Sequence, residues 1–300
     1  MMRVRFGVSP IAWSNSDLPQ LGGDISLETC LAQSREAGFS GVETGIKFPL
    51  AAHILGPLLD RYGLALVSGW FSGELLHRSL AEEKARMEAQ VATFKALGAP
   101  VMVYAETSGS IQSRIDTPLS LRPRIGDEQF RSYGAKLTEL AEWMAGRGVA
   151  LAYHHHMGTI IELQREIDLV MQHTGSAVGL LIDTGHLAYA GADVLAVTRR
   201  HARRINHIHC KDVRPEVLKR VRQRDNSFLS AVLEGVFTVP GDGCLDYYEF
   251  ARLLAEIGYS GWVVVEAEQD PVKAPPLEYS RMGLRHLSAA FGAAGYAVTQ

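Results

Sequence analysis

Residues 149–183 read VALAYHHHMGTIIELQREIDLVMQHTGSAVGLLID, and this segment contains one complete structural unit of the chain. Val149–Tyr153 and Val178–Asp183 are short β-rich runs. Between them, Glu162–His173 repeats apolar residues at intervals of three and four, as an amphipathic helix does. A strand, a helix and a second strand in this order are typical of two parallel strands joined by a helical crossover.

The same unit recurs along the whole chain. Further strand-like runs lie at Val4–Val8, Gly41–Glu43, Ala65–Ser68, Pro100–Tyr104, Ile205–His209 and Trp262–Glu266. Further helical runs lie at Leu27–Ala37, Ala51–Tyr62, Ala81–Leu97, Asp127–Arg147, Ala192–Arg203, Tyr247–Ile257 and Leu277–Ala290. Eight such units predict an α/β fold, a (β/α)₈ TIM barrel, with residues 1–300 as a single domain. A doubly wound open sheet is the alternative, but no G-x-G-x-x-G follows the first strand.

Local signals support these boundaries. Gly38, Gly63, Gly98, Gly148 and Gly258 each follow a helical run and precede a strand, where a left-handed glycine commonly ends a helix. Two long connections, Glu106–Ile125 and Lys211–Leu245, leave the carboxyl ends of strands, where a barrel builds its active site.

Composition narrows the class of protein. The net charge of −3 shows no basic excess, so we expect no nucleic-acid partner. No run approaches the roughly 18 apolar residues of a membrane span. The odd, widely spaced set Cys30, Cys210 and Cys244 is a poor disulfide framework, which favours a cytoplasmic protein. A homo-oligomer is an open option.

Polar and titratable residues gather where the last four predicted strands end. The segments are YHHHMGT (153–159), DTGH (183–186), HIHCKD (207–212) and EAEQD (266–270). The carboxyl ends of barrel strands meet at one face, and alternate residues point inward. Buried charge needs a compensating cation, and mixed His, Asp and Glu ligands suit a divalent transition ion. One ligand from each strand predicts the metal set His154, Asp183, His209 and Glu266.

Each of these segments has a structural alternative when it is taken alone. An isolated H-x-H is more often structural, consecutive histidines can form a surface tract, and Asp183 can cap a helix. On the fifth strand, the period of two places His154 and His156 on one face, so either can be the ligand there. The convergence of four neighbouring strand ends favours the metal site.

These motifs resemble those of the xylose-isomerase-like barrels, which include sugar epimerases, hydroxypyruvate isomerases and endonuclease IV. The matching residues are Asp183-x-x-His186, the H-x-H-x-K-D segment from 207 to 212, and Glu266. The whole chain more closely resembles the inosose dehydratase (2-keto-myo-inositol dehydratase) family of inositol catabolism. The segments that carry this likeness are GVSPIAWSN (7–15), LVSGWFSG (66–73), LAYHHHMGT (151–159), LIDTGHLAYAG (181–191), HIHCKDVRP (207–215), GVFTVPGDG (235–243) and VVVEAEQDP (263–271).

The resemblance implies an activity and its cofactors. It implies a lyase that removes water from 2-keto-myo-inositol (scyllo-inosose) to give 3D-trihydroxycyclohexane-1,2-dione, with Mn²⁺ or Co²⁺ and with glutathione. In the wider superfamily the fifth strand usually supplies a glutamate, so an imidazole replaces that carboxylate here. This departure fits the dehydratase better than a standard epimerase.

Dehydration next to a ketone needs groups that move protons. A base takes the proton beside the carbonyl, and an acid protonates the departing hydroxyl. We predict His156 and His186 as this pair, with Lys211 and Glu268 as further catalytic candidates. Near the ends of the first four strands, residues suited to a polyol ketone predict the substrate site, although the tryptophans can equally be core residues. These residues are Trp13, Glu43, Lys47, Trp70 and Glu106.

Three other functions compete with this one. A keto-sugar isomerase or epimerase would use the same metal cluster, because both reactions stabilise an enediolate. A DNA-repair enzyme like endonuclease IV would need more ligands and a basic groove. A noncatalytic sugar-binding barrel would not need the candidate proton donors.

Overall fold

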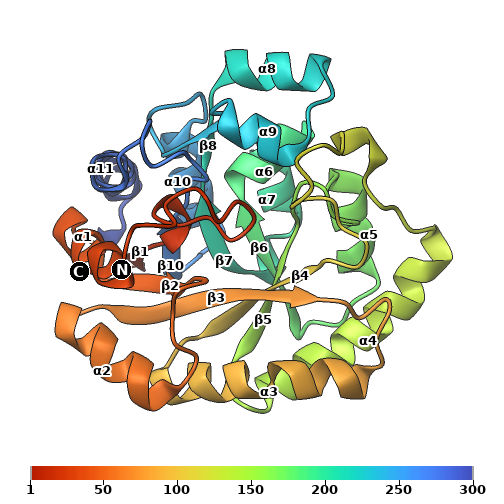
Figure 1. Cartoon of the computed structure of the whole chain (residues 1–300). Coiled ribbons are helices and arrows are strands. Elements are labelled where there is room, and N and C mark those ends of the chain that lie inside the picture. Colours follow the sequence, from red (N-terminus) through yellow and green to blue (C-terminus); the bar gives the residue numbers. More distant parts are fainter. Residues whose placement is uncertain (1, 299–300) are drawn as a thin grey trace.

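The computed structural model describes residues 2–298 and contains a closed parallel barrel (Figure 1). Its strands follow the order β10-β7-β6-β5-β4-β3-β2-β1, and β10 also pairs with β1, which closes the sheet. Each neighbouring pair runs parallel. The strands are β1 Arg3–Val8, β2 Gly41–Thr44, β3 Ala65–Gly73, β4 Val101–Glu106, β5 Ala150–His154, β6 Val178–Asp183, β7 Ile205–Cys210 and β10 Gly261–Val265. The predicted (β/α)₈ barrel is therefore confirmed.

Helices surround the barrel where the apolar periodicity predicts them, with ends that differ by a few residues (Figure 1). Gly38 and Gly63 end the first two helices with φ of 107° and 63°, which confirms the predicted left-handed caps. The helices are α1 Leu27–Ala37, α2 Ala52–Tyr62, α3 Leu80–Leu97, α4 Asp127–Ala145, α5 Gln164–Gln172, α7 Val194–Arg200, α10 Tyr247–Glu256 and α11 Pro276–Ala293.

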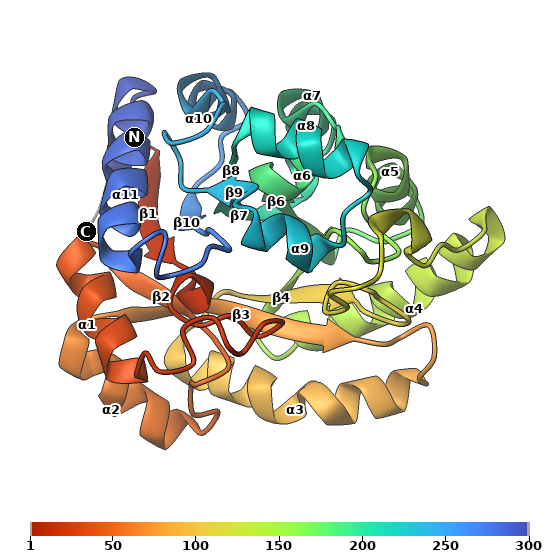
Figure 2. The ribbon, with the colours of Figure 1, turned by 45° about the horizontal axis from the view of Figure 1, so that its top comes forward.

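The structure adds elements that the sequence pattern did not reveal. After β6 the chain forms a short helix at once, because Asp183 caps its first turn. The long connection after β7 is largely ordered, and its elements lie together beside α6 (Figure 2). The added elements are α6 Thr184–Ala190, α8 Pro215–Gln223, α9 Phe228–Leu233, β8 Asp212–Val213, β9 Phe237–Thr238, β11 Ala297–Val298, and the 3₁₀ turns η1 Pro10–Ala12, η2 Leu119–Leu121 and η3 Ala202–Arg204.

Apolar side chains fill one part of the barrel interior. Val67, Trp262 and Val264 form a cluster there, separate from the main core between sheet and helices. Gly41 makes room for this cluster, since a Cβ on Gly41 would lie 2.5 Å from Val67 Cγ2. A second small cluster, Val101, Val103, Ala152 and Leu181, comes from β4, β5 and β6. The polar strand ends continue from this apolar layer.

The connection after β4 is held in place by a buried arginine. The Arg122 side chain is 1% exposed and lies between Glu162 and Glu166, with Nε 3.2 Å from Glu162 Oε1 and Nη2 2.5 Å from Glu166 Oε1. Its Nη1 also donates to the carbonyl of Thr159 at 3.0 Å. This single side chain therefore ties the connection to the segment that follows the three histidines.

We expect Arg122→Ala to lower the free energy of unfolding by about 3–5 kcal/mol, because it leaves two buried carboxylates without their cation. Urea denaturation monitored by circular dichroism measures this difference. Arg124→Ala is the matched control, since Arg124 is exposed two residues further on and its loss should change stability by no more than about 0.5 kcal/mol. Equal effects of the two substitutions would contradict the anchoring role.

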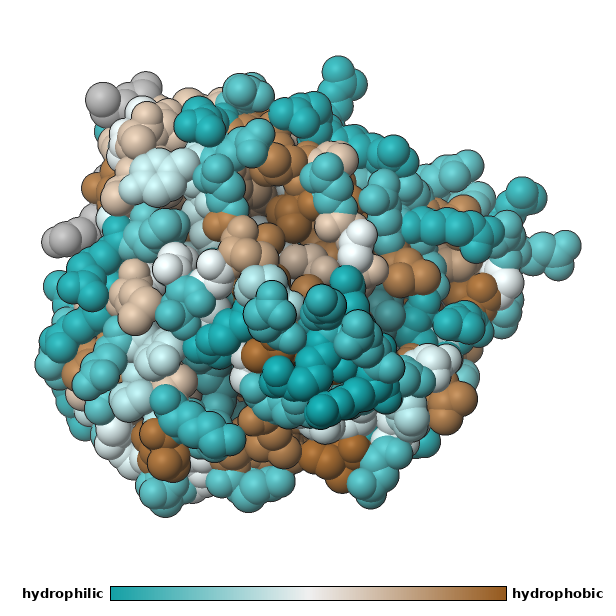
Figure 3. Space-filling model, turned by 90° about the horizontal axis from the view of Figure 1, so that it is seen from above, coloured by the Kyte–Doolittle hydropathy of each residue, from teal (hydrophilic) through white to brown (hydrophobic). Residues whose placement is uncertain are grey.

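Three further features concern the helices, the surface and the cysteines. Among residues 2–298, no helix combines the length and the apolar character needed to cross a bilayer. Seen from above, hydrophilic side chains cover most of the visible face (Figure 3). Cys30 and Cys210 are buried free thiols, and Cys244 is an exposed one.

Candidate active site

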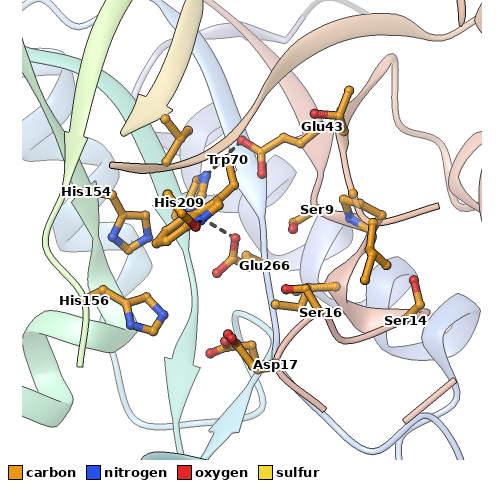
Figure 4. A pocket seen from close by; sticks show the side chains of 18 of the residues that line it. Ser9, Ser14, Ser16, Asp17, Glu43, Trp70, His154, His156, His209 and Glu266 are labelled. Carbon is orange, nitrogen blue, oxygen red and sulfur yellow. Dashed lines mark hydrogen bonds and ion pairs between the residues drawn. The ribbon is translucent and has the colours of Figure 1, made fainter. Parts of the chain in front are cut away.

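The polar cluster continues the inward face of the strands. Ala152 and Leu181 belong to the interior apolar layer, so the residues two positions later, His154 and Asp183, point to the same side. Asp183 is paired in register with His209 on the next strand. One ligand atom from each of four buried side chains lies within 4.8 Å of the others, and three of these side chains are labelled in Figure 4. The four residues are His154, Asp183, His209 and Glu266.

Hydrogen bonds assign which nitrogen of His154 is free. Nδ1 lies at hydrogen-bond distance from the carbonyl oxygen of His155, so it carries the proton and donates. Nε2 then carries the lone pair and lies 3.6 Å from Asp183 Oδ2. This is the tautomer that a metal-binding imidazole needs.

A carboxylate orients the second histidine. His209 Nε2 donates to Glu43 Oε1 at 2.9 Å, which leaves Nδ1 as the free nitrogen. Nδ1 lies 3.0 Å from Glu266 Oε2 and 3.7 Å from Asp183 Oδ2, yet it makes no hydrogen bond. Glu43, predicted as a substrate contact, therefore supports His209 from behind. His207 also contacts Glu43 Oε1, at 2.9 Å.

Asp183 caps a helix and is also placed to bind a metal ion, so the two interpretations of this residue are compatible. Its Oδ1 accepts the backbone N–H of His186 at 2.9 Å and caps α6. Its Oδ2 is fully buried and has no hydrogen-bond partner among the described residues. Unpaired buried acceptors are costly, and Asp183 Oδ2 faces the unpaired nitrogen of His209. These two atoms fit a divalent cation bound between them.

Lys211 neutralises part of the cluster. Its ammonium is fully buried, 2.6 Å from Glu266 Oε1, 3.0 Å from Glu268 Oε2 and 3.6 Å from Asp183 Oδ2. Burial alone would lower the pKa of Lys211, but these carboxylates raise it, so the side chain stays charged. Burial would likewise raise the pKa of Asp183, but the charge of Lys211 and the neighbouring histidines hold it well below its ordinary value.

The predicted proton-handling residues form a second cluster beside the first. The rings of His156 and His186 lie 4.0 Å apart, and His186 Nε2 lies 3.1 Å from Lys211 Nζ. His156 Nδ1 donates to the carbonyl of Met157 at 2.8 Å, so its Nε2 carries the lone pair. Burial, followed by the charge of nearby His154, lowers the pKa of His156 well below its usual value, which favours a neutral imidazole.

A cavity of about 440 Å³ opens over these clusters (Figure 4). His156 and Glu268 line it together with three of the candidate metal ligands, whereas His186 and Lys211 do not line it and lie behind. The Trp70 ring packs in a T-shaped arrangement against the cavity histidines, with centroid distances of 5.5 Å to His154 and 5.6 Å to His156. A substrate in this cavity would therefore rest between an indole, two imidazoles and several carboxylates.

Three predicted substrate residues do not reach the cavity. Trp13 is 1% exposed, packs in the main core and donates from Nε1 to Gln33 Oε1 at 2.7 Å. Lys47 donates to backbone carbonyls between residues 22 and 25. Glu106 is buried and accepts the backbone N–H groups of Leu75 and Ser108. Trp13 and Lys47 lie outside the strands, so nearness to a strand end did not specify where they point. Glu106 instead ends β4 on the outward face that it shares with Tyr104. Each of the three side chains holds a loop.

Sequence reasoning missed several cavity residues on loops. Asp17 lines the cavity from the connection after β1, and Gln112 lines it from the connection after β4. Asp17 lies two residues after the GVSPIAWSN segment (7–15), and the family resemblance of that segment was the nearest sequence signal for Asp17. The polar cavity residues absent from the predicted set are Ser9, Ser14, Ser16, Asp17, Thr44, Ser72, Gln90 and Gln112.

A parallel barrel with a His, Asp, His and Glu cluster at the ends of β5, β6, β7 and β10 defines a candidate metal-binding TIM-barrel enzyme. The chain belongs to the xylose isomerase-like TIM barrel family, whose model matches residues 31–290. It is 49% identical to the rhizopine catabolism protein MocC of Rhizobium meliloti, over 99% of this chain and 91% of that protein. It is 42% identical to an inosose dehydratase of Geobacillus thermodenitrificans (strain NG80-2), over 97% of this chain and 98% of that protein.

A solved structure shares the fold. L-ribulose 3-epimerase superposes with a TM-score of 0.68 at 16% identity, over 97% of this chain and 96% of that one. At this identity the likeness concerns the barrel alone, so the choice between dehydration and epimerisation depends on the site and on the sequence relatives.

Proposed function

We propose that this chain is a metal-dependent hydro-lyase that removes water from 2-keto-myo-inositol to give 3D-trihydroxycyclohexane-1,2-dione. The observation that carries the proposal is the placement of a neutral imidazole and a carboxylate, His156 and Glu268, on one cavity with the candidate metal ligands. The near full-length similarity to an inosose dehydratase supports the same substrate.

The proposed cofactor is one divalent ion, Mn²⁺ or Co²⁺. When bound by His154, Asp183, His209 and Glu266, it supplies Lewis-acid stabilisation of negative charge on the substrate oxygens. Two imidazoles and two carboxylates are a mixed nitrogen and oxygen donor set, which suits such ions.

The chain's own residues handle the protons. His156 Nε2 carries a lone pair and its ring lines the cavity, so it is placed to take the proton beside the ketone. Glu268 Oε2 is held 3.0 Å from Lys211 Nζ, and the carboxyl group also lines the cavity. Burial raises the pKa of Glu268 to about 7, so its protonated carboxyl group is placed to give a proton to the departing hydroxyl, which leaves as water. His186 contacts both His156 and Lys211 and positions them from behind.

Glutathione does not fit this cavity. It carries two carboxylates, and the cavity lining carries four carboxylates and neither lysine nor arginine among the described residues. No step is assigned to it. A cytoplasmic location and a homo-oligomer stay predictions.

The proposed reaction is tested by incubating the metal-loaded protein with 2-keto-myo-inositol and, separately, with keto-sugars. Chromatography coupled to mass spectrometry should find a product lighter by one water from the inosose, whereas each keto-sugar should elute as a single unreacted peak. A product of unchanged mass from either substrate, with no water lost, would show an isomerase or epimerase and overturn the proposal.

A further inference from the structure

The loop after β1 is anchored at two points over the cavity. At its start, Trp13 is buried and bonded to Gln33 on α1. At its far end, Lys47 Nζ donates to the carbonyls of Gly22 and Gly23, each at 3.0 Å, and to that of Ile25. A Cβ on Gly22 would lie 1.8 Å from Trp13 O, so the two ends of the loop touch. The side chains predicted to bind substrate therefore fix the path of this loop.

The anchored loop presents one carboxylate to the cavity. Asn15 is 2% exposed, and its Oδ1 accepts the backbone N–H groups of Asp17 and Leu18 at 2.8 and 2.9 Å. This Asx turn fixes the backbone at Asp17. The Asp17 side chain points into the cavity toward His156 and Glu266 (Figure 4).

Asp17 differs from the other carboxylates of the cavity. Glu43 contacts two histidines, and Glu266 and Glu268 both contact Lys211. Among residues 2–298, no lysine, arginine or histidine lies within ion-pair distance of Asp17. Its neighbours are the amide of Gln112, which is 7% exposed and whose Oε1 is buried without a partner, and the carboxyl group of Glu268, whose pKa is raised by burial and also by the charge of Asp17. Burial raises the pKa of Asp17, which the hydrogen bond from Gln112 partly offsets.

We propose that Asp17 is a specificity-determining residue, whose carboxylate accepts a hydrogen bond from a ring hydroxyl of the substrate on the side of the cavity away from β5 to β7. This assignment rests on the proposed function and identifies the side chain that recognises one hydroxyl group of the substrate. A partly desolvated carboxylate without a cation needs donors, and a neutral polyol supplies them as hydroxyl groups. A phosphorylated or carboxylated sugar would instead bring a second negative charge against Asp17.

The experiment compares Asp17→Ala with the parent chain, both loaded with Mn²⁺. A hydrogen bond to a charged group is worth about 1.5–3 kcal/mol, so KM for 2-keto-myo-inositol should rise about 10–100-fold. The change in kcat should be much smaller, because the charge of Asp17 is a minor cause of the raised pKa of Glu268. Calorimetric binding of myo-inositol, a polyol without the ketone, should weaken by the same factor. Because this second measurement needs no turnover, it tests Asp17 even if the proposed dehydration proves wrong.

Singly deoxygenated inososes identify the hydroxyl. One analogue should bind the parent chain as weakly as the full substrate binds Asp17→Ala. The same analogue should lose no further affinity in the variant, because its contact with Asp17 is already absent. Asp24→Asn and Asp24→Ala, exposed on the same loop, are matched controls that should leave KM unchanged. The proposal would be overturned by an unchanged KM in Asp17→Ala, or by a fall in its kcat at constant KM. It would also be overturned if every analogue bound the variant more weakly than the parent chain, so that the two losses of affinity add.

Discussion

Asp183→Asn should remove most of the bound metal while the barrel stays folded. Asparagine keeps the cap on α6, because its side-chain oxygen can still accept the N–H of His186. It removes the negative charge of the side chain, whose Oδ2 faces the unpaired Nδ1 of His209. We expect metal affinity to fall by at least about 100-fold, beyond the usual effect of losing an outer-shell partner, and turnover to fall with it. His209→Ala and Glu266→Ala should behave alike.

Metal content after dialysis, measured by mass spectrometry, and thermal melting separate this effect from unfolding. The informative control is His207→Gln. Glu43, His207 and His209 form a second candidate group of ligands, and His209 belongs to both groups. Full metal content in Asp183→Asn, together with metal loss in His207→Gln, would move the ion to that second group.

His156→Gln and Glu268→Gln should each retain metal but lose about 10²–10⁴-fold in kcat, the usual contribution of one general acid or base. Both side chains line the cavity, so each can reach a substrate that rests over the metal ligands. His186→Gln should lose less, because His186 acts through its contacts with His156 and Lys211.

Exchange of solvent deuterium into the carbon beside the ketone distinguishes the two roles. The variant without the base should stop exchanging, whereas the variant without the acid should continue. His53→Gln, an exposed histidine on α2, is the control for the substitution itself and should keep normal turnover. Near-normal kcat in both His156→Gln and Glu268→Gln would remove them from the reaction and direct attention to Lys211 and His186.

The amino-acid sequence alone was sufficient for the barrel and for the four residues of the buried His, Asp and Glu cluster that could hold a metal ion. Helix and strand periodicities are local properties, and the helix-ending glycines marked where a helix gives way to the next strand. Side chains two positions apart on a strand point to the same side, so Asp183 points inward like Leu181, and His154 like Ala152. The inward direction of these side chains can therefore be counted along the chain.

Tertiary structure decided the rest, because side-chain direction outside regular strands depends on contacts distant in sequence. Trp13 and Lys47 lie outside the strands, and their partners on α1 and on the loop after β1 turn them away from the cavity. The same contacts bring Asp17 in from a loop with no periodicity. Glu43 lies 166 positions before His209 in the sequence, and only closure of the barrel brings their side chains to 2.9 Å.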